Sequence, residues 1–212
     1  MPRQRQVNQL LVEGKNDQHV IWALCQYYQV PESFSVEVPN GNQNEGLEAL
    51  LRSIPVRLKI SGLRSLGIIV DADENLVGRW NAVCHRLREA GYQNLPAEPD
   101  VNGFITTPSD APRVGIWLMP NNQLPGMLET FVAHLIPDGD LLAPQAEAIL
   151  KELERNGLHR YRLIHHPKAF IHTWLAWQEN PGMPMGQAIT AQVLHPNKAS
   201  AIRFIDWLNR LF

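Results

Sequence analysis

The sequence predicts an α/β fold in which a doubly wound, mainly parallel four-stranded sheet is followed by a C-terminal helical appendage. Two observations support this fold class. Short apolar runs alternate with segments of helical period through the first two thirds of the chain, which is typical of parallel βαβ units. Beyond Pro137 the pattern predicts helices alone. We therefore expect an α/β core over residues 1–137 and a helical appendage, packed on that core, over residues 138–212.

The expected strands are short apolar runs bounded by turn residues. They cover residues 7–12, 34–38, 66–71 and 114–119. Between and after them, apolar residues recur near a 3.6-residue period and predict helices at 16–29, 45–55, 75–89 and 127–136. The segment 91–113 is rich in Pro, Asp and Gly, so we expect an excursion there with one short strand at 104–106. The C-terminal helices are expected at 141–156, 168–179, 185–194 and 198–212.

Composition and charge exclude several classes of protein. With 212 residues, of which 44% are hydrophobic, the chain can bury a full core and does not have the composition of a disordered protein. Its formal charge of −2 argues against a globally basic nucleic-acid binder. The charge is uneven, however. Residues 1–150 hold 11 Lys and Arg against 17 Asp and Glu, whereas residues 151–212 hold 8 against 4.

The cysteines and the start of the chain indicate the cellular compartment. Cys25 and Cys84 stand alone, without the spacing of a zinc site or a disulfide framework, which fits a reducing cytosol. No signal-type apolar segment follows the basic start of the chain, and no run approaches the length of a membrane span. We expect a cytoplasmic protein that does not associate with membranes.

The most informative stretch is the apolar run 66–70, which ends in Asp71, Ala72 and Asp73. In an open α/β sheet the carboxyl ends of the strands border the ligand crevice, so both carboxylates are expected at its mouth. Two such close negative charges repel each other unless a cation lies between them, and Mg²⁺ is usually bound by one or two carboxylates with water and phosphate. The alternative is that Asp71 and Asp73 only open a loop and cap the next helix.

Three further acids have a similar position in the predicted fold. Glu13 follows the first strand, Asp17 lies in the first turn of the next helix, and Glu129 lies in the first turn after the fourth strand. Scattered surface acids would fall on helix faces and loop tips instead. For Asp17 and Glu129 an ordinary role at a helix N-terminus is about as well supported as a metal role.

These motifs resemble the TOPRIM domain, an acidic α/β module shared by topoisomerases, bacterial primases and the overcoming-lysogenization-defect nucleases. The resemblance rests on Glu13-Gly14 after an apolar run, with Asp17 four residues on, and on Asp71-Ala72-Asp73 after the third strand. It covers roughly residues 7–136, and Glu129 resembles a further acid of the nuclease branch. The segments 117–123 and 171–178 are similar to stretches of a small group of stand-alone bacterial TOPRIM-like proteins.

The resemblance implies phosphodiester chemistry on nucleic acid with Mg²⁺ or Mn²⁺, and hence a magnesium-dependent nuclease or nuclease subunit. Asp71 and Asp73 would be direct or water-bridged metal ligands, and Glu13 a ligand or a base. Asp17 and Glu129 would support a second ion. Lys15 would neutralise a phosphate or the transition state, or else is a solvated loop residue. The larger nucleases carry an ATPase with a GxxxxGK[ST] loop, which this sequence lacks, so an ATPase is a candidate protein partner.

Several downstream residues have both a functional and an ordinary interpretation. His165, His166 and His172, with Lys168, would contact phosphate if the appendage folds over the crevice, but we expect surface or packing roles for the histidines. Trp174 and Trp177 lie three residues apart on one face of a predicted helix. Tryptophans in such positions lie in the core more often than they form a platform for base stacking. The polar segment 121–123 either positions substrate or forms a plain turn.

Two other function classes stay open. One is a non-catalytic subunit that binds nucleic acid or protein and keeps the acids for a structural metal site. The other is a phosphohydrolase or nucleotidyl-transfer enzyme with a small substrate. A pocket closed by the helical appendage would favour the small substrate, whereas an open acidic crevice flanked by basic residues would favour a polynucleotide.

Overall fold

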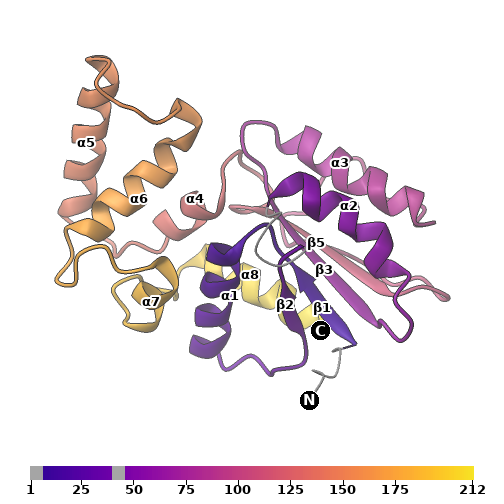
Figure 1. Cartoon of the computed structure of the whole chain (residues 1–212). Helices are drawn as coiled ribbons and strands as arrows, with labels where there is room; N and C mark the ends of the chain where they lie inside the picture. Colours follow the sequence, from indigo (N-terminus) through magenta and orange to yellow (C-terminus); the bar gives the residue numbers. More distant parts are fainter. Residues whose placement is uncertain (1–6, 40–45) are drawn as a thin grey trace.

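The computed structural model of the chain describes residues 7–39 and 46–212, and its centre is a five-stranded sheet (Figure 1). The strands lie in the order β2-β1-β3-β5-β4. Their bounds are Asn8–Leu11 (β1), Ser35–Glu37 (β2), Ser65–Asp71 (β3), Phe104–Thr106 (β4) and Arg113–Met119 (β5). β1, β2, β3 and β5 are parallel to their neighbours, and β4 runs antiparallel to β5. The predicted α/β class with a mainly parallel sheet is confirmed.

The expectation of four strands is wrong. The short strand expected at 104–106 exists, but it is a fifth strand of the same sheet, paired with the first half of β5. Its three residues are half-buried, as expected at a sheet edge. An edge strand of this length does not need the continuous apolar run that indicates a central strand, so the sequence does not mark it as part of the sheet.

Eight α-helices and a 3₁₀ turn are present in the part of the chain that the structure describes. The helices are α1 (Lys15–Tyr27), α2 (Leu47–Leu58), α3 (Leu76–Glu89), α4 (Leu128–Ala133), α5 (Leu142–Arg155), α6 (His166–Ala176), α7 (Met185–Thr190) and α8 (Ala199–Leu211), and the turn is η2 (Leu163–His165). The expected helix start at residue 45 lies outside the described residues. Pro55 does not end α2, which continues to Leu58. Beyond Pro137 the structure contains helices and no strand among its described residues. None of these helices is both long enough and apolar enough to cross a lipid bilayer.

The sheet is covered on both faces, as the continuous buried runs of β3 and β5 require. Alternate residues of β3 belong to different cores: Ile68 and Val70 pack with residues of α2 and α3, whereas Ile69 packs with residues of α1, α4 and α8. Trp117 of β5 lies in the second of these cores, against Phe204 and other aromatic residues. The last helix is therefore part of the core that covers one face of the sheet.

Glycines let α8 lie close against the sheet. A Cβ on Gly115 of β5 would lie 2.7 Å from Leu211 Cδ2, and one on Gly67 of β3 would lie 3.0 Å from that atom. Gly103, just before β4, has φ +82°, and its added Cβ would lie 2.2 Å from the Trp207 ring. Trp207 also donates its Nε1–H to the Phe104 carbonyl oxygen at 3.3 Å.

The Gly103→Ala substitution should destabilise the protein by about 3 kcal/mol, because it adds backbone strain at a positive φ to an overpacked contact with Trp207. Gly62→Ala is the matched control, since Gly62 has φ +81° and nothing within 4 Å of the added Cβ. It should cost only the backbone term of about 1–2 kcal/mol. Urea unfolding of both variants measures the difference, and equal losses would contradict the packing role of Gly103.

Candidate active site

A cavity of about 390 Å³ lies where the carboxyl ends of β1 and β3 meet the starts of α1, α4 and α6. Its position follows from parallel pairing, because neighbouring parallel strands end at the same edge of the sheet. The cavity is lined by Glu13, Gly14, Lys15, Asn16, Asp17, Gly46, Asp71, Leu128, Glu129 and Lys168. Four of the five predicted metal-site acids are therefore among its lining residues, together with Lys15.

Two of these acids come from the β1–α1 connection. Glu13 follows the buried end of β1, and Gly14 is the N-cap of α1. Asp17, 7% exposed, accepts a hydrogen bond at Oδ2 from the Gly14 N–H at 3.2 Å. This bond holds the Asp17 side chain back over the first turn, beside Glu13.

Asp71 is tied to both neighbouring segments. Its N–H donates to Glu13 Oε1 at 2.8 Å, and its own Oδ1 accepts from the Leu128 N–H at 2.9 Å. The first bond joins β3 to the loop after β1, and the second joins β3 to the first residue of α4. Asp71 does not cap α3, as the alternative interpretation had it; that cap is Asn75, whose Oδ1 accepts from the Gly78 N–H at 2.8 Å.

Glu129 and Lys168 close the opposite side of the cavity. Glu129, in the first turn of α4, is only 4% exposed, and Lys168 Nζ from α6 lies 3.3 Å from its Oε1. The Lys168 side chain stays half-exposed at 50%. The helical region beyond Pro137 thus contributes a cation to the cavity wall.

Burial, followed by the crowding of carboxyl groups, raises the pKa values of three of the cavity acids. Burial raises the pKa of Asp17 to about 7, with a further contribution from the charge of Glu13. Burial, followed by the charges of Asp17, Glu13, Glu129 and Asp73, raises the pKa of Asp71 well above its usual range. Burial also raises the pKa of Glu13, against the lowering effect of the hydrogen bond from the Asp71 N–H. A cation in the cavity would reverse these shifts, since it would favour the ionised carboxylates.

Asp73 is not among the residues that line the cavity. Its carboxylate forms an ion pair with Arg79 of α3, and its backbone N–H and carbonyl both bond to Gly126 at 2.7 Å. These bonds hold Asp73 at φ +48°, a conformation that turns it away from the line of β3. Asp73 still acts on the site through its charge, because it raises the pKa values of Glu13 and Asp71. Arg79 lies six residues beyond Asp73 and is not part of any motif in the sequence that indicates this ion pair.

The polar segment after β5 has a structural role. Asn122 Oδ1 accepts from the Leu118 N–H at 2.7 Å, and Asn121 Oδ1 accepts from the N–H groups of Gln123 and Leu124. These side chains close a turn next to the cis bond between Met119 and Pro120. The interpretation as a plain polar turn accounts for Asn121 and Asn122.

His166 joins the two helices α5 and α6. Its Nδ1 lies 2.7 Å from Glu154 Oε1, and its Nε2 lies 2.9 Å from Glu147 Oε2. Burial alone would lower the pKa of His166, but the hydrogen bonds to Glu154 and Glu147 outweigh it and raise the pKa above its usual value. His166 thus has the packing role expected for it, and His172 is exposed. Trp174 is buried, whereas Trp177 is 38% exposed.

No group of three or more His, Cys, Asp or Glu side chains within residues 7–39 and 46–212 is placed so that it could hold a metal ion. Each of the four cavity carboxyl groups commits one oxygen to a protein donor, namely the N–H of Asp71, Gly14 or Leu128, or the Lys168 ammonium. Hard oxygen ligands of this kind suit Mg²⁺, which is usually bound by one or two carboxylates rather than by a cage of protein ligands.

The fold and cavity define an α/β protein with a carboxylate-rich pocket at the carboxyl edge of a mainly parallel sheet. The chain belongs to the family described as Protein of unknown function (DUF3226), which matches residues 7–212. No curated protein and no solved structure matches the chain.

In metal-free buffer, Asp17→Asn should make the protein more stable at pH 8. The unfolded chain releases the Asp17 proton near pH 4, whereas the folded protein holds it to about pH 7. The free energy of unfolding of the wild type therefore falls as pH rises from about 4 to about 7. The amide of the variant does not ionise, so the variant does not lose this stability. We expect a melting temperature about 5 °C above that of the wild type at pH 8, and no gain at pH 4. Asp206→Asn, at an exposed position, is the control, and equal gains for both variants would contradict the burial of the Asp17 charge.

His166→Ala should lower the melting temperature more at pH 6 than at pH 8.5. The raised pKa of His166 means that its stabilising effect is complete below the pKa of an unfolded histidine, about 6.5, and is lost as pH rises through the higher folded value. His172→Ala serves as the control at an exposed histidine. A loss for His166→Ala that does not depend on pH would show that the imidazole acts by packing alone.

Proposed function

We propose that this protein catalyses metal-dependent phosphodiester chemistry on nucleic acid and acts as a Mg²⁺-dependent nuclease. One observation carries the proposal: Glu13, Asp17, Asp71 and Glu129 meet in a single cavity whose rim carries Lys15 and Lys168. Buried like charges are costly unless they are protonated or neutralised by a cation. Acids that give a cation its ligands, next to lysines that attract phosphate, are the combination that phosphoryl transfer requires.

The carboxyl groups divide into two sets by position. Glu13 and Asp71 are linked through the Asp71 N–H, and they would provide the ligands of one Mg²⁺ or Mn²⁺ ion. Asp17 and Glu129 line the same cavity and would support a second ion, while Asp73 would act on the site through its charge. Bound metal would supply an activated water and stabilise the leaving oxygen.

The two lysines would bind the substrate rather than the metal. Lys15 is exposed at the start of α1, and Lys168 reaches the cavity from α6. Their ammonium groups would neutralise phosphate oxygens on opposite sides of the cavity. The arrangement favours a polynucleotide over a small phosphate ester, because basic residues flank the acids and both lysines remain accessible to a ligand longer than the cavity.

The resemblance of the segments around Glu13 and Asp71 to the TOPRIM family supports the same reaction class. A cytoplasmic location also fits, because Cys25 and Cys84 are free thiols, which is usual in reducing compartments.

The test is cleavage of plasmid DNA, single-stranded DNA and RNA with Mg²⁺ or Mn²⁺. Asp71→Asn should reduce the rate by at least about a hundredfold, because a metal ligand would be lost, whereas Asp206→Asn, at an exposed acid on α8, should cut at the wild-type rate. EDTA should abolish cleavage.

Metal binding is measured separately, as the rise in melting temperature on adding Mg²⁺ or Mn²⁺ at pH 8. Wild type and Asp206→Asn should be stabilised, and Asp71→Asn should not. Cleavage that persists in Asp71→Asn at the wild-type rate would disprove the proposed site. Stabilisation by metal without cleavage of any substrate would instead favour a binding subunit, and repeating the assay with a partner ATPase would then be the next measurement.

A further inference from the structure

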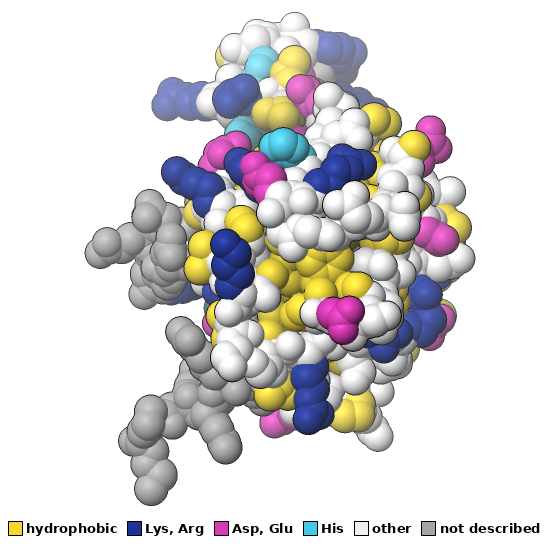
Figure 2. All heavy atoms as spheres, turned by 90° about the vertical axis from the view of Figure 1, so that its right-hand side faces the viewer, with side chains coloured by type: hydrophobic (Ala, Val, Ile, Leu, Met, Phe, Trp, Pro, Cys, Tyr) yellow, Lys and Arg dark blue, Asp and Glu magenta, His cyan; other side chains and the backbone are white. Residues whose placement is uncertain are grey.

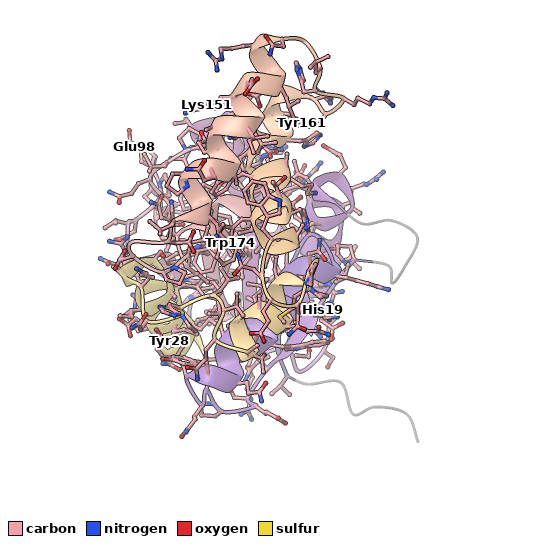
Figure 3. All side chains as sticks on the ribbon, turned by 90° about the vertical axis from the view of Figure 1, so that its left-hand side faces the viewer. His19, Tyr28, Glu98, Lys151, Tyr161 and Trp174 are labelled. Carbon is pink, nitrogen blue, oxygen red and sulfur yellow. The ribbon has the colours of Figure 1, made fainter. Side chains whose placement is uncertain are left out.

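α5 and α6 form a projecting arm, which we define as residues 142–176. Figure 1 shows these two helices side by side, extending away from the sheet, with α4 at their base. His166 of α6 contacts both Glu147 and Glu154 of α5, and these contacts join the two helices. Tyr161, in the connection between them, donates its O–H to Glu154 Oε1 at 2.8 Å, which ties the connection to α5. In Figure 3, Tyr161 lies toward the end of the arm and Trp174 near its base.

The end of the arm is basic and carries no acid of its own. Residues 155–168 contain four Lys or Arg residues and no Asp or Glu. Arg155, Arg160 and Arg162 are exposed, and none of the three forms an ion pair with any described residue. Figure 2 shows Lys and Arg side chains at the upper end of the molecule, among acidic, histidine and hydrophobic side chains. Of the acids of α5, Glu147 and Glu154 are bonded to His166, and Glu152 is exposed.

This basic segment is continuous with the cavity. Its last residue, Lys168, is the one that contacts Glu129 in the cavity wall, and it lies in the first turn of α6. Arg162 and Arg160 are six and eight residues before it, in the connection that leads away from the cavity. Basic residues therefore occur at the end of α5, in the connection and in the first turn of α6, where Lys168 lines the cavity.

The distribution of these basic residues favours a long phosphate ligand. Lys168 lines the cavity, whereas Arg155, Arg160 and Arg162 do not. A small phosphate ester that filled the cavity would leave the three arginines without a ligand. A nucleic-acid strand could contact both Lys168 and the arginines, since duplex DNA carries a phosphate about every 3.4 Å along each strand.

We propose that the arm binds the phosphate backbone of a polynucleotide and guides it past the carboxylate-rich cavity. Arg155, Arg160 and Arg162 bind phosphates remote from the reacting bond, and Lys168 binds a phosphate near it. The contacts are to the backbone, so the arm contributes affinity without sequence preference. This inference rests on the proposed function for the identity of its ligand, but binding can be measured without catalysis.

The test is fluorescence anisotropy with labelled 30-nucleotide single-stranded DNA, RNA and a 30-base-pair duplex, in Ca²⁺ or EDTA, from 50 to 300 mM salt. The wild type should bind at least one of the three probes. The Arg160→Ala/Arg162→Ala variant should bind that probe about tenfold more weakly at low salt, and the slope of log K against log salt should fall by about 1–2. The Arg64→Ala/Arg88→Ala variant is the matched control, because it removes the same charge from exposed sites on the strand and helix side away from the arm. It should bind like the wild type.

Three results would overturn the inference. They are equal affinity of the arm variant and the wild type, an equal loss in the control variant, and binding of none of the three probes. Poly-glutamate of matched charge is the competitor that tests the rival ligand, an acidic protein. If it displaced the probe as well as unlabelled DNA does, the arm would be assigned to a protein partner instead.

The same variants separate this inference from the proposed function. If the wild type cuts and the arm variant binds and cuts equally well, the inference fails and the nuclease proposal stands. If nothing is cut but only the arm variant loses binding, the inference stands and the nuclease proposal fails. Asp71→Asn should bind like the wild type in EDTA, since it leaves the arm intact.

Discussion

Parallel pairing of β3 with β1 on one side and β5 on the other is the constraint on which the rest of the structure depends. It aligns Leu11 with Ile68 and Asp71 with Met119. The loops that follow these strands therefore begin at the same edge of the sheet. The loop after β1 brings Glu13, the end of β3 brings Asp71, and the loop after β5 leads to Glu129. The acids meet because the strands are parallel, although they are separated by up to 116 residues in the chain.

Bringing these acids together is unfavourable in itself, and backbone amides offset part of the cost. The N–H groups of Gly14, Asp71 and Leu128 each bond to a cavity carboxyl group. Glu129 is the one of the four acids that pairs with a cation within residues 7–39 and 46–212, and that cation, Lys168, belongs to the region beyond the sheet. Burial, together with the neighbouring negative charges, raises the pKa values of Glu13, Asp17 and Asp71, and the same conditions suit the cavity to an added positive charge.

The α/β class was predictable because buried parallel strands produce continuous apolar runs, as in Leu66–Val70. β4 was recognised as a short strand but not as part of the sheet, because its three half-buried residues show no such run and pairing across the Pro-rich segment is not encoded locally. Glu13 and Asp71 could be brought together from the strand pattern alone. The departure of Asp73 could not, since it depends on an ion pair with Arg79 and on backbone bonds to Gly126. Lys168 had a local signal, its place in a basic segment, but its approach to Glu129 depends on how α6 packs against α4.

The position of α8 has a consequence for how the protein forms during translation. α8 follows every strand in chain order, yet its residues Leu211 and Trp207 fill the space above Gly115 in the middle of the sheet. A nascent chain can therefore pair all five strands while one face of the sheet lacks α8, one of the helices whose residues pack on it. That face holds Trp117, which contacts Phe204 and Trp207 of α8, so this part of the core stays incomplete until the last helix has been synthesised and docks.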